Sequence, residues 1–107
     1  MKARTRSTPE RQIDAERLLL TALCQQTISQ SAQEEVLRHF AARKFAHAEH
    51  QVVFWALSQL PARDPAIIRE LLATRLTVMG FPDLDFDVFF KGPVPSESEI
   101  STLLQLL

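Results

Sequence analysis

Apolar residues recur every three or four positions through most of this chain, and this spacing constrains the fold more than any other feature. It places apolar side chains on one face of an α-helix. The stripes are Ile13, Leu20, Leu23 and Cys24; Val36, Leu37 and Phe40; Val53, Leu57 and Leu60; Ile67, Ile68, Leu71, Leu72 and Leu76; and Ile100, Leu103, Leu104 and Leu107. Only 2 of the 107 residues are Gly, which disfavours a turn-rich β fold. The sequence therefore predicts an all-α fold, a compact helical bundle of about five to six helices.

Cap residues set the limits of the first predicted helices. Thr8-Pro9-Glu10 is typical of a helix start, and we expect the first helix over 9–26. Ser31 and Glu34 have the spacing of a capping box, which predicts a second helix reaching about residue 40. The third helix is expected over 48–60, ended by proline.

The third helix has an unusually wide apolar face. Phe54 and Trp55 lie beside its apolar stripe. A helix with such a face is typically the central one of a bundle. We therefore expect Trp55 to be buried.

The later helices have clear boundary signals as well. Asp64-Pro65 opens a fourth helix that is expected to end near Met79, and Gly80 stands at its C′ position. Residues 82–91 alternate acidic and apolar side chains, but an isolated strand would have no pairing partner. We expect a short helix there. Ser96-Glu97-Ser98-Glu99 is a second capping box and opens the last helix.

The two ends of the chain differ from the middle. Residues 1–8 are polar and basic and are expected to be a tail or the end of a linker, followed by one domain over 9–107. The last helix reaches Leu106-Leu107 without a Gly, Pro or basic cap. We therefore expect the domain to be cut within its last helices.

No residue set has the pattern of a catalytic, cofactor or metal site. His47 and His50 are three residues apart, whereas helical zinc ligands are usually four apart, and only Cys24 or His39 could complete such a site. Asp83, Asp85 and Asp87 resemble the start of a calcium loop, but the later positions do not fit. We expect neither metal nor cofactor, and no enzymatic activity of this segment.

The net charge, the cysteine content and the lack of long apolar runs exclude further classes of protein. The formal net charge of -1 does not indicate a polyanion-binding domain. Cys24 is the only cysteine, which fits a small buried side chain better than a reactive thiol. No apolar run approaches the ~20 residues of a membrane span, and no apolar segment of a secretory signal follows the basic start. A cytoplasmic location is expected.

Several segments together resemble the C-terminal helicase-binding domain of bacterial DNA primase (DnaG type). The segments, in chain order, are Ala15-Glu16-Arg17-Leu18-Leu19-Leu20, Arg43-Lys44-Phe45, Glu49-His50, Asp64-Pro65 with Ile67-Ile68, and Ser96-Glu97-Ser98-Glu99-Ile100. The resemblance covers about residues 14–104. It implies a docking module of DNA replication that tethers primase to the hexameric replicative helicase of the primosome and modulates it.

The resemblance also limits the activity. The parent would be a DNA-directed RNA polymerase that makes primers, but its catalytic domain would lie outside these residues. Nucleic acid would be contacted only indirectly, through the parent protein.

Two alternatives stay open. The first helix also resembles that of the N-terminal domain of the replicative helicase (DnaB type), at Pro9, Ile13, Asp14, Ala15, Glu16 and Leu20. That domain has the same fold and would serve oligomerisation and primase docking. The basic residues at the start also fit a small helical DNA-binding regulator.

The last helix contributes the candidate partner-binding residues. These are Ile100, Leu103, Leu104, Leu106 and Leu107. Burying several exposed Leu side chains would strongly favour association. We expect this face to dock onto the helicase, or onto a second copy of the same truncated helix.

Overall fold

The computed structural model describes the backbone of residues 2–26, 28–42, 45–60 and 64–107, and the side chains in these ranges from residue 10 onward. It contains the helices α1 (Lys2–Gln25), α2 (Gln30–Ala41), α3 (Ala48–Ser58), α4 (Pro65–Val78) and α5 (Glu97–Leu106), and the 3₁₀ helix η1 (Asp87–Phe90). The described residues include no strand. The predicted all-α bundle of about five to six helices is confirmed, and the short helix expected within residues 82–91 is η1.

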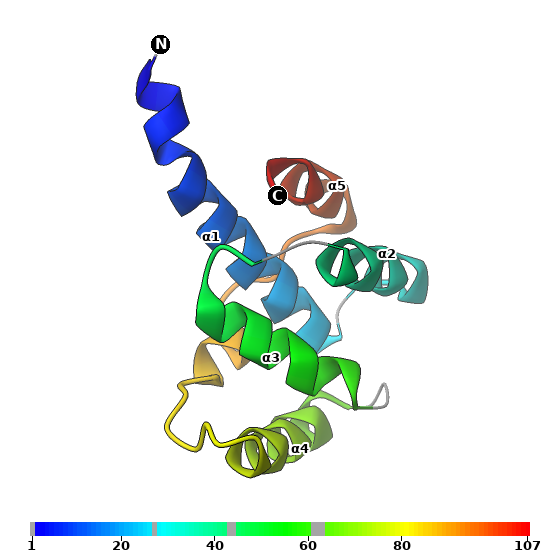
Figure 1. Cartoon of the computed structure of the whole chain (residues 1–107). Coiled ribbons are helices and arrows are strands. Elements are labelled where there is room, and N and C mark those ends of the chain that lie inside the picture. Colours follow the sequence, from blue (N-terminus) through cyan, green and yellow to red (C-terminus); the bar gives the residue numbers. More distant parts are fainter. Residues whose placement is uncertain (1, 27, 43–44, 61–63) are drawn as a thin grey trace.

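Helix α1 starts earlier than the sequence indicated. It begins at Lys2 rather than at Pro9, because the first residues include Ala, Arg and Lys, which favour helix. Pro9 is the eighth residue of this helix, where it lacks the amide that would bond to the carbonyl of residue 5. Figure 1 shows this end of α1 extending beyond the other helices.

The start of α2 also differs from the prediction. Ser29, not Ser31, is the N-cap, and its Oγ accepts a hydrogen bond from the Ala32 amide at 3.2 Å. The Ser31–Glu34 capping box is therefore wrong. Either serine could act as the N-cap of a helix that begins in this segment. Ser29 is in addition held in place by a hydrogen bond to a distant part of the chain. Its amide donates to Glu97 of α5 at 2.8 Å.

Other helix ends are formed as the sequence predicts. Asp64 caps α4, accepting from the Ala66 amide at 2.9 Å. Ser96 and Glu99 form the capping box of α5. Gly80 follows α4 with a φ of 96°. There the Gly80 amide donates to the Thr77 carbonyl and the Phe81 amide to the Leu76 carbonyl, which is the Schellman arrangement. The predicted stop at Pro61 lies outside the described residues.

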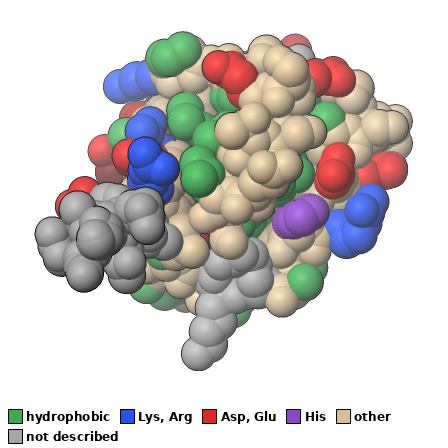
Figure 2. All heavy atoms as spheres, turned by 90° about the horizontal axis from the view of Figure 1, so that it is seen from above, with side chains coloured by type: hydrophobic (Ala, Val, Ile, Leu, Met, Phe, Trp, Pro, Cys, Tyr) green, Lys and Arg blue, Asp and Glu red, His purple; other side chains and the backbone are tan. Residues whose placement is uncertain are grey.

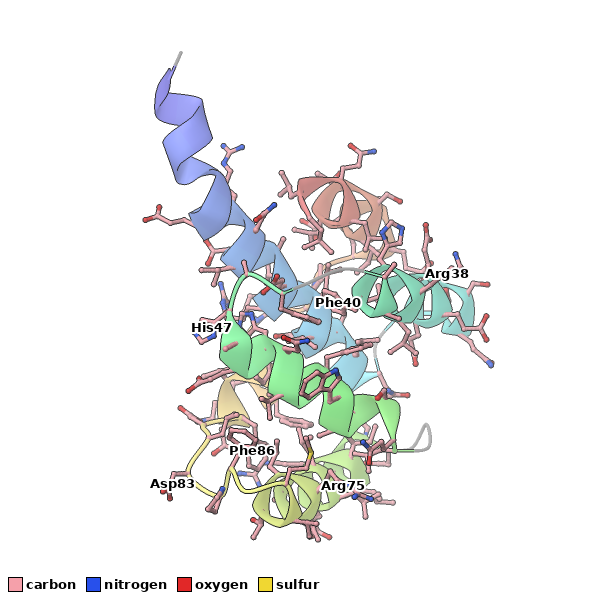
Figure 3. All side chains as sticks on the ribbon, in the orientation of Figure 1. Arg38, Phe40, His47, Arg75, Asp83 and Phe86 are labelled. Atoms are coloured by element: carbon pink, nitrogen blue, oxygen red, sulfur yellow. The ribbon has the colours of Figure 1, made fainter. Side chains whose placement is uncertain are left out.

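Helix α1 lies at the centre of the bundle. It packs against η1, α5 and α3, and more lightly against α4 and α2 (Figure 1). Its buried side chains include Leu19, Leu20, Leu23 and Cys24. Against them pack the aromatic rings of Phe40, Phe45 and Phe54, whose centroids lie 4.6–5.5 Å apart. In Figure 3, Phe40 lies on the α3 side of α2, while Arg38 lies on the far side.

Three predicted core residues lie at the surface instead. Trp55 of α3 is 48% exposed, and Ile67 and Leu71 of α4 are 44% and 36% exposed. The expectation that Trp55 is buried is therefore wrong, and the inner face of α4 is narrower than predicted. Both helices have an apolar arc wider than the neighbouring helices cover. The covered residues of α4 are Ile68, Leu72 and Leu76.

Candidate functional site

Glu16 of α1 is a charged residue in the core. It is only 1% exposed, and its carboxylate accepts hydrogen bonds from the segment that leads into α3. The Ala46 amide donates to Oε2 at 2.6 Å, the His47 amide to Oε1 at 3.4 Å, and His50 Nδ1 to Oε1 at 2.9 Å. A buried carboxylate is stable only with such partners. Glu16 therefore fixes the start of α3 against α1.

Two histidines contact this buried carboxylate, His50 through its ring and His47 through its backbone amide. His47 is the N-cap of α3, and its Nδ1 accepts from the Glu49 amide at 3.1 Å. Its ring stacks on that of His50 with centroids 4.7 Å apart, and His50 also meets Phe89 of η1 edge-on at 5.8 Å. Burial lowers the pKa of His50 below 6.5, because lost solvation outweighs the hydrogen bond and charge of Glu16. Neutral His50 therefore donates a hydrogen bond from Nδ1–H to the Glu16 carboxylate.

The sequence signal for Glu16 was available but was missed. Glu16 lies three residues after Ile13 and four before Leu20, which places it inside the apolar stripe of the first helix. A carboxylate in that position must find buried donors. In the sequence, Glu16 stands out only within the segment that resembles the primase domain.

The remaining candidate metal ligands are Cys24, His39 and the acidic residues of 83–87. Cys24 is fully buried, and burial raises the pKa of its thiol, in agreement with a small apolar role. In the described part of the chain, no group of three His, Cys, Asp or Glu side chains could hold a metal ion. Two of the three acidic residues in 83–87 already have partners, because Asp87 pairs with Arg69 and Asp85 accepts from the Asp87 amide.

An apolar groove lies where α5 meets α1. Its volume is about 320 Å³, and it is lined by Leu18, Pro93, Val94, Pro95, Glu99, Thr102 and Leu103. Leu18 comes from α1, the two prolines from the segment before α5, and Leu103 from α5 itself. The volume is at the lower end of the ~300–1,000 Å³ of small-molecule sites. The groove is therefore smaller than most such sites.

The five residues predicted to bind a partner are divided between the core and the surface. Ile100 and Leu104 are 2% and 7% exposed and belong to the core, so that they present no free surface. Leu103 and Leu107 are half-buried and pack beside that core. Leu106 is half-buried too. Of the five, only Leu103 lines the groove.

Among the side chains drawn in colour in Figure 2, Lys and Arg lie mainly at the left and right edges of the view, between acidic and hydrophobic groups. The basic side chains of Lys2, Arg4 and Arg6 lie outside the described residues.

Comparison with protein-family models, curated proteins and solved structures finds no match to this chain. No helix in the described part of the chain is long and apolar enough to cross a membrane.

Proposed function

We propose that this domain is a protein-docking module that binds its partner through the groove between α1 and α5. The observation that carries the proposal is the composition of that groove. Leucine, valine and proline side chains come together there from three segments, with the Glu99 carboxylate and the Thr102 hydroxyl beside them. An apolar pocket with a few polar groups at its edge is typical of the places where a partner inserts an anchor side chain.

The groove has a rigid base. Pro95 is buried, and Ser96 and Glu99 form the capping box that fixes the first turn of α5. A second link joins that turn to α2, where Glu97 accepts from the Ser29 amide. A preformed site loses little conformational entropy on binding, which favours docking without refolding.

The resemblance of the sequence motifs to the primase C-terminal domain suggests the partner. On that basis the module tethers primase to the hexameric replicative helicase and modulates it in DNA replication. The alternative is the N-terminal domain of the helicase itself, because the first helix fits both families. In either case the segment is expected to do no chemistry, so that the purified domain should neither make primers nor hydrolyse nucleotides.

Binding of the purified replicative helicase hexamer tests the proposal. Leu18→Ser and Leu103→Ser change the groove from two different helices, and each should weaken binding at least about tenfold. Val88→Ser is the matched control, because Val88 is 44% exposed and does not line the groove. Circular dichroism verifies that each variant is folded.

Three results would contradict parts of the proposal. Unchanged helicase binding by both folded groove variants would place the docking site elsewhere. Binding to a primase fragment, and not to the helicase, would favour the helicase alternative. Retention on duplex DNA with a steep salt dependence would favour a DNA-binding regulator.

A further inference from the structure

Helix α4 carries two separate apolar stripes. Ile68, Leu72 and Leu76 are buried and face the rest of the bundle. The second stripe, Ile67, Leu71, Thr74 and Val78, lies at the surface. Its apolar members are 44%, 36% and 70% exposed. We call these four residues the outer stripe of α4.

The outer stripe has the spacing of a coiled-coil seam. Its members are separated by four, three and four residues, which matches positions d, a, d and a of a heptad. In this register Glu70 takes position g and Arg75 takes position e, on opposite flanks of the stripe. Among the described side chains, neither forms an ion pair within the domain.

The charges of Glu70 and Arg75 determine which partner helix fits against the outer stripe. In a parallel pair of helices, each g residue faces the e residue five positions later in the partner helix. Two parallel copies of α4 would therefore join Glu70 of each copy to Arg75 of the other. An antiparallel pair with the same seam would instead place Glu70 opposite Thr77 and Arg75 opposite Ile68, so that neither charge would gain an oppositely charged partner.

We propose that α4 docks in parallel onto α4 of a second copy of this chain, with the outer stripe as the seam. The pairing is separate from the docking function, because α4 lies at the end of the bundle opposite α5 (Figure 1). Arg75 lies on this helix in Figure 3. A seam from one helix of 14 residues buries less than a standard interface. The dimer is therefore weak and concentration-dependent.

Sedimentation equilibrium of the whole chain, from micromolar to millimolar concentration, tests the charge pairing. The wild-type chain should dimerise, and added salt should weaken the dimer. Glu70→Arg and Arg75→Glu should each weaken it about tenfold, since each replaces two attractive pairs by two repulsive ones. The double variant Glu70→Arg/Arg75→Glu keeps the net charge and should restore the wild-type affinity.

Disulfide trapping tests the direction of the two helices. In a parallel pair, position 78 of one copy faces position 78 of the other, so Val78→Cys should form a covalent dimer under mild oxidation. Val88→Cys is exposed outside α4 and serves as the control, and the buried Cys24 should not react.

The proposal is overturned if the wild-type chain stays monomeric throughout. It is also overturned if neither charge reversal weakens the dimer, or if Val78→Cys forms a disulfide-linked dimer no faster than Val88→Cys. Loss of the dimer on substitution of Leu103 or Leu106, with α4 intact, would place self-association on α5 instead.

Discussion

The carboxylate of Glu16 and the imidazole of His50 are joined by a hydrogen bond of 2.9 Å, and both side chains are buried. The pair connects α1 to the first turn of α3. The same carboxylate holds the Ala46 and His47 amides, and every buried side-chain nitrogen and oxygen in the described residues has a partner. Removing one member of this network therefore leaves buried polar groups without partners.

Replacing Glu16 should be strongly destabilising. Glu16→Ala leaves two backbone amides and the His50 proton without an acceptor, which should cost about 3–5 kcal/mol of unfolding free energy. Urea denaturation followed by circular dichroism measures this loss. Asp14→Ala is the control, because the side chains of the Asp14–Arg17 pair are 67% and 45% exposed, and such pairs contribute ~0–1 kcal/mol. Equal midpoints for the two variants would show that the buried network contributes little.

The stability should fall as the pH drops below 6.5. The pKa of His50 is lowered in the folded domain, by burial first and by His47 and Arg17 as well, against the opposing influence of Glu16. The unfolded chain therefore takes up a proton at a higher pH than the folded one. The contribution of His50 to the unfolding free energy is complete above pH 6.5. It is lost as the pH falls toward the pKa of His50 in the folded domain, at up to about 1.4 kcal/mol per pH unit.

Thermal unfolding across this pH range measures the effect. The Tm of the wild-type chain should decline on acidification, and His50→Gln should make the decline shallower. His39→Gln changes an exposed histidine and should leave the slope as it is. A Tm that rises on acidification would mean that the charged form of His50 is the one favoured by folding.

The fluorescence of the native domain should be that of a partly hydrated indole. Trp55 is the only tryptophan and is 48% exposed, so its emission should shift little on unfolding and should be quenched by iodide in the native state. Trp55→Ala should cost under about 1 kcal/mol, whereas Phe54→Ala should cost about 3–5 kcal/mol. A strongly blue-shifted native emission would contradict the exposure of Trp55.

Cap signals in the sequence predicted the ends of the later helices but misplaced the starts of α1 and α2. The caps at Asp64 and Ser96 and the Gly80 terminus depend on residues within one turn, and the structure confirms them. Trp55, Ile67 and Leu71 were misplaced because an apolar arc does not reveal which half a neighbour covers. That choice depends on how α3 and α4 pack together, which is a tertiary property.

The candidate site also combines features that periodicity predicts with features that depend on tertiary packing. Periodicity placed Ile100, Leu103 and Leu104 on one side of α5, but it could not tell which of them faces α1 and α2. The groove also needs Leu18 and the Pro93–Pro95 segment, which are far from α5 in the sequence or outside any helix. The partner of Glu16 likewise lies 34 residues away.

Substitutions in α5 should separate stability from binding. Leu104 is 7% exposed in the core, so Leu104→Ala should lower the unfolding free energy by about 2–5 kcal/mol. Leu103 is half-buried at the groove, and Leu103→Ser should cost about 1 kcal/mol while weakening helicase binding. Urea denaturation and binding measured on the same preparations distinguish the two effects. If Leu103→Ser destabilises the domain as much as Leu104→Ala, Leu103 belongs to the core. The weaker binding would then reflect unfolding rather than the loss of a contact.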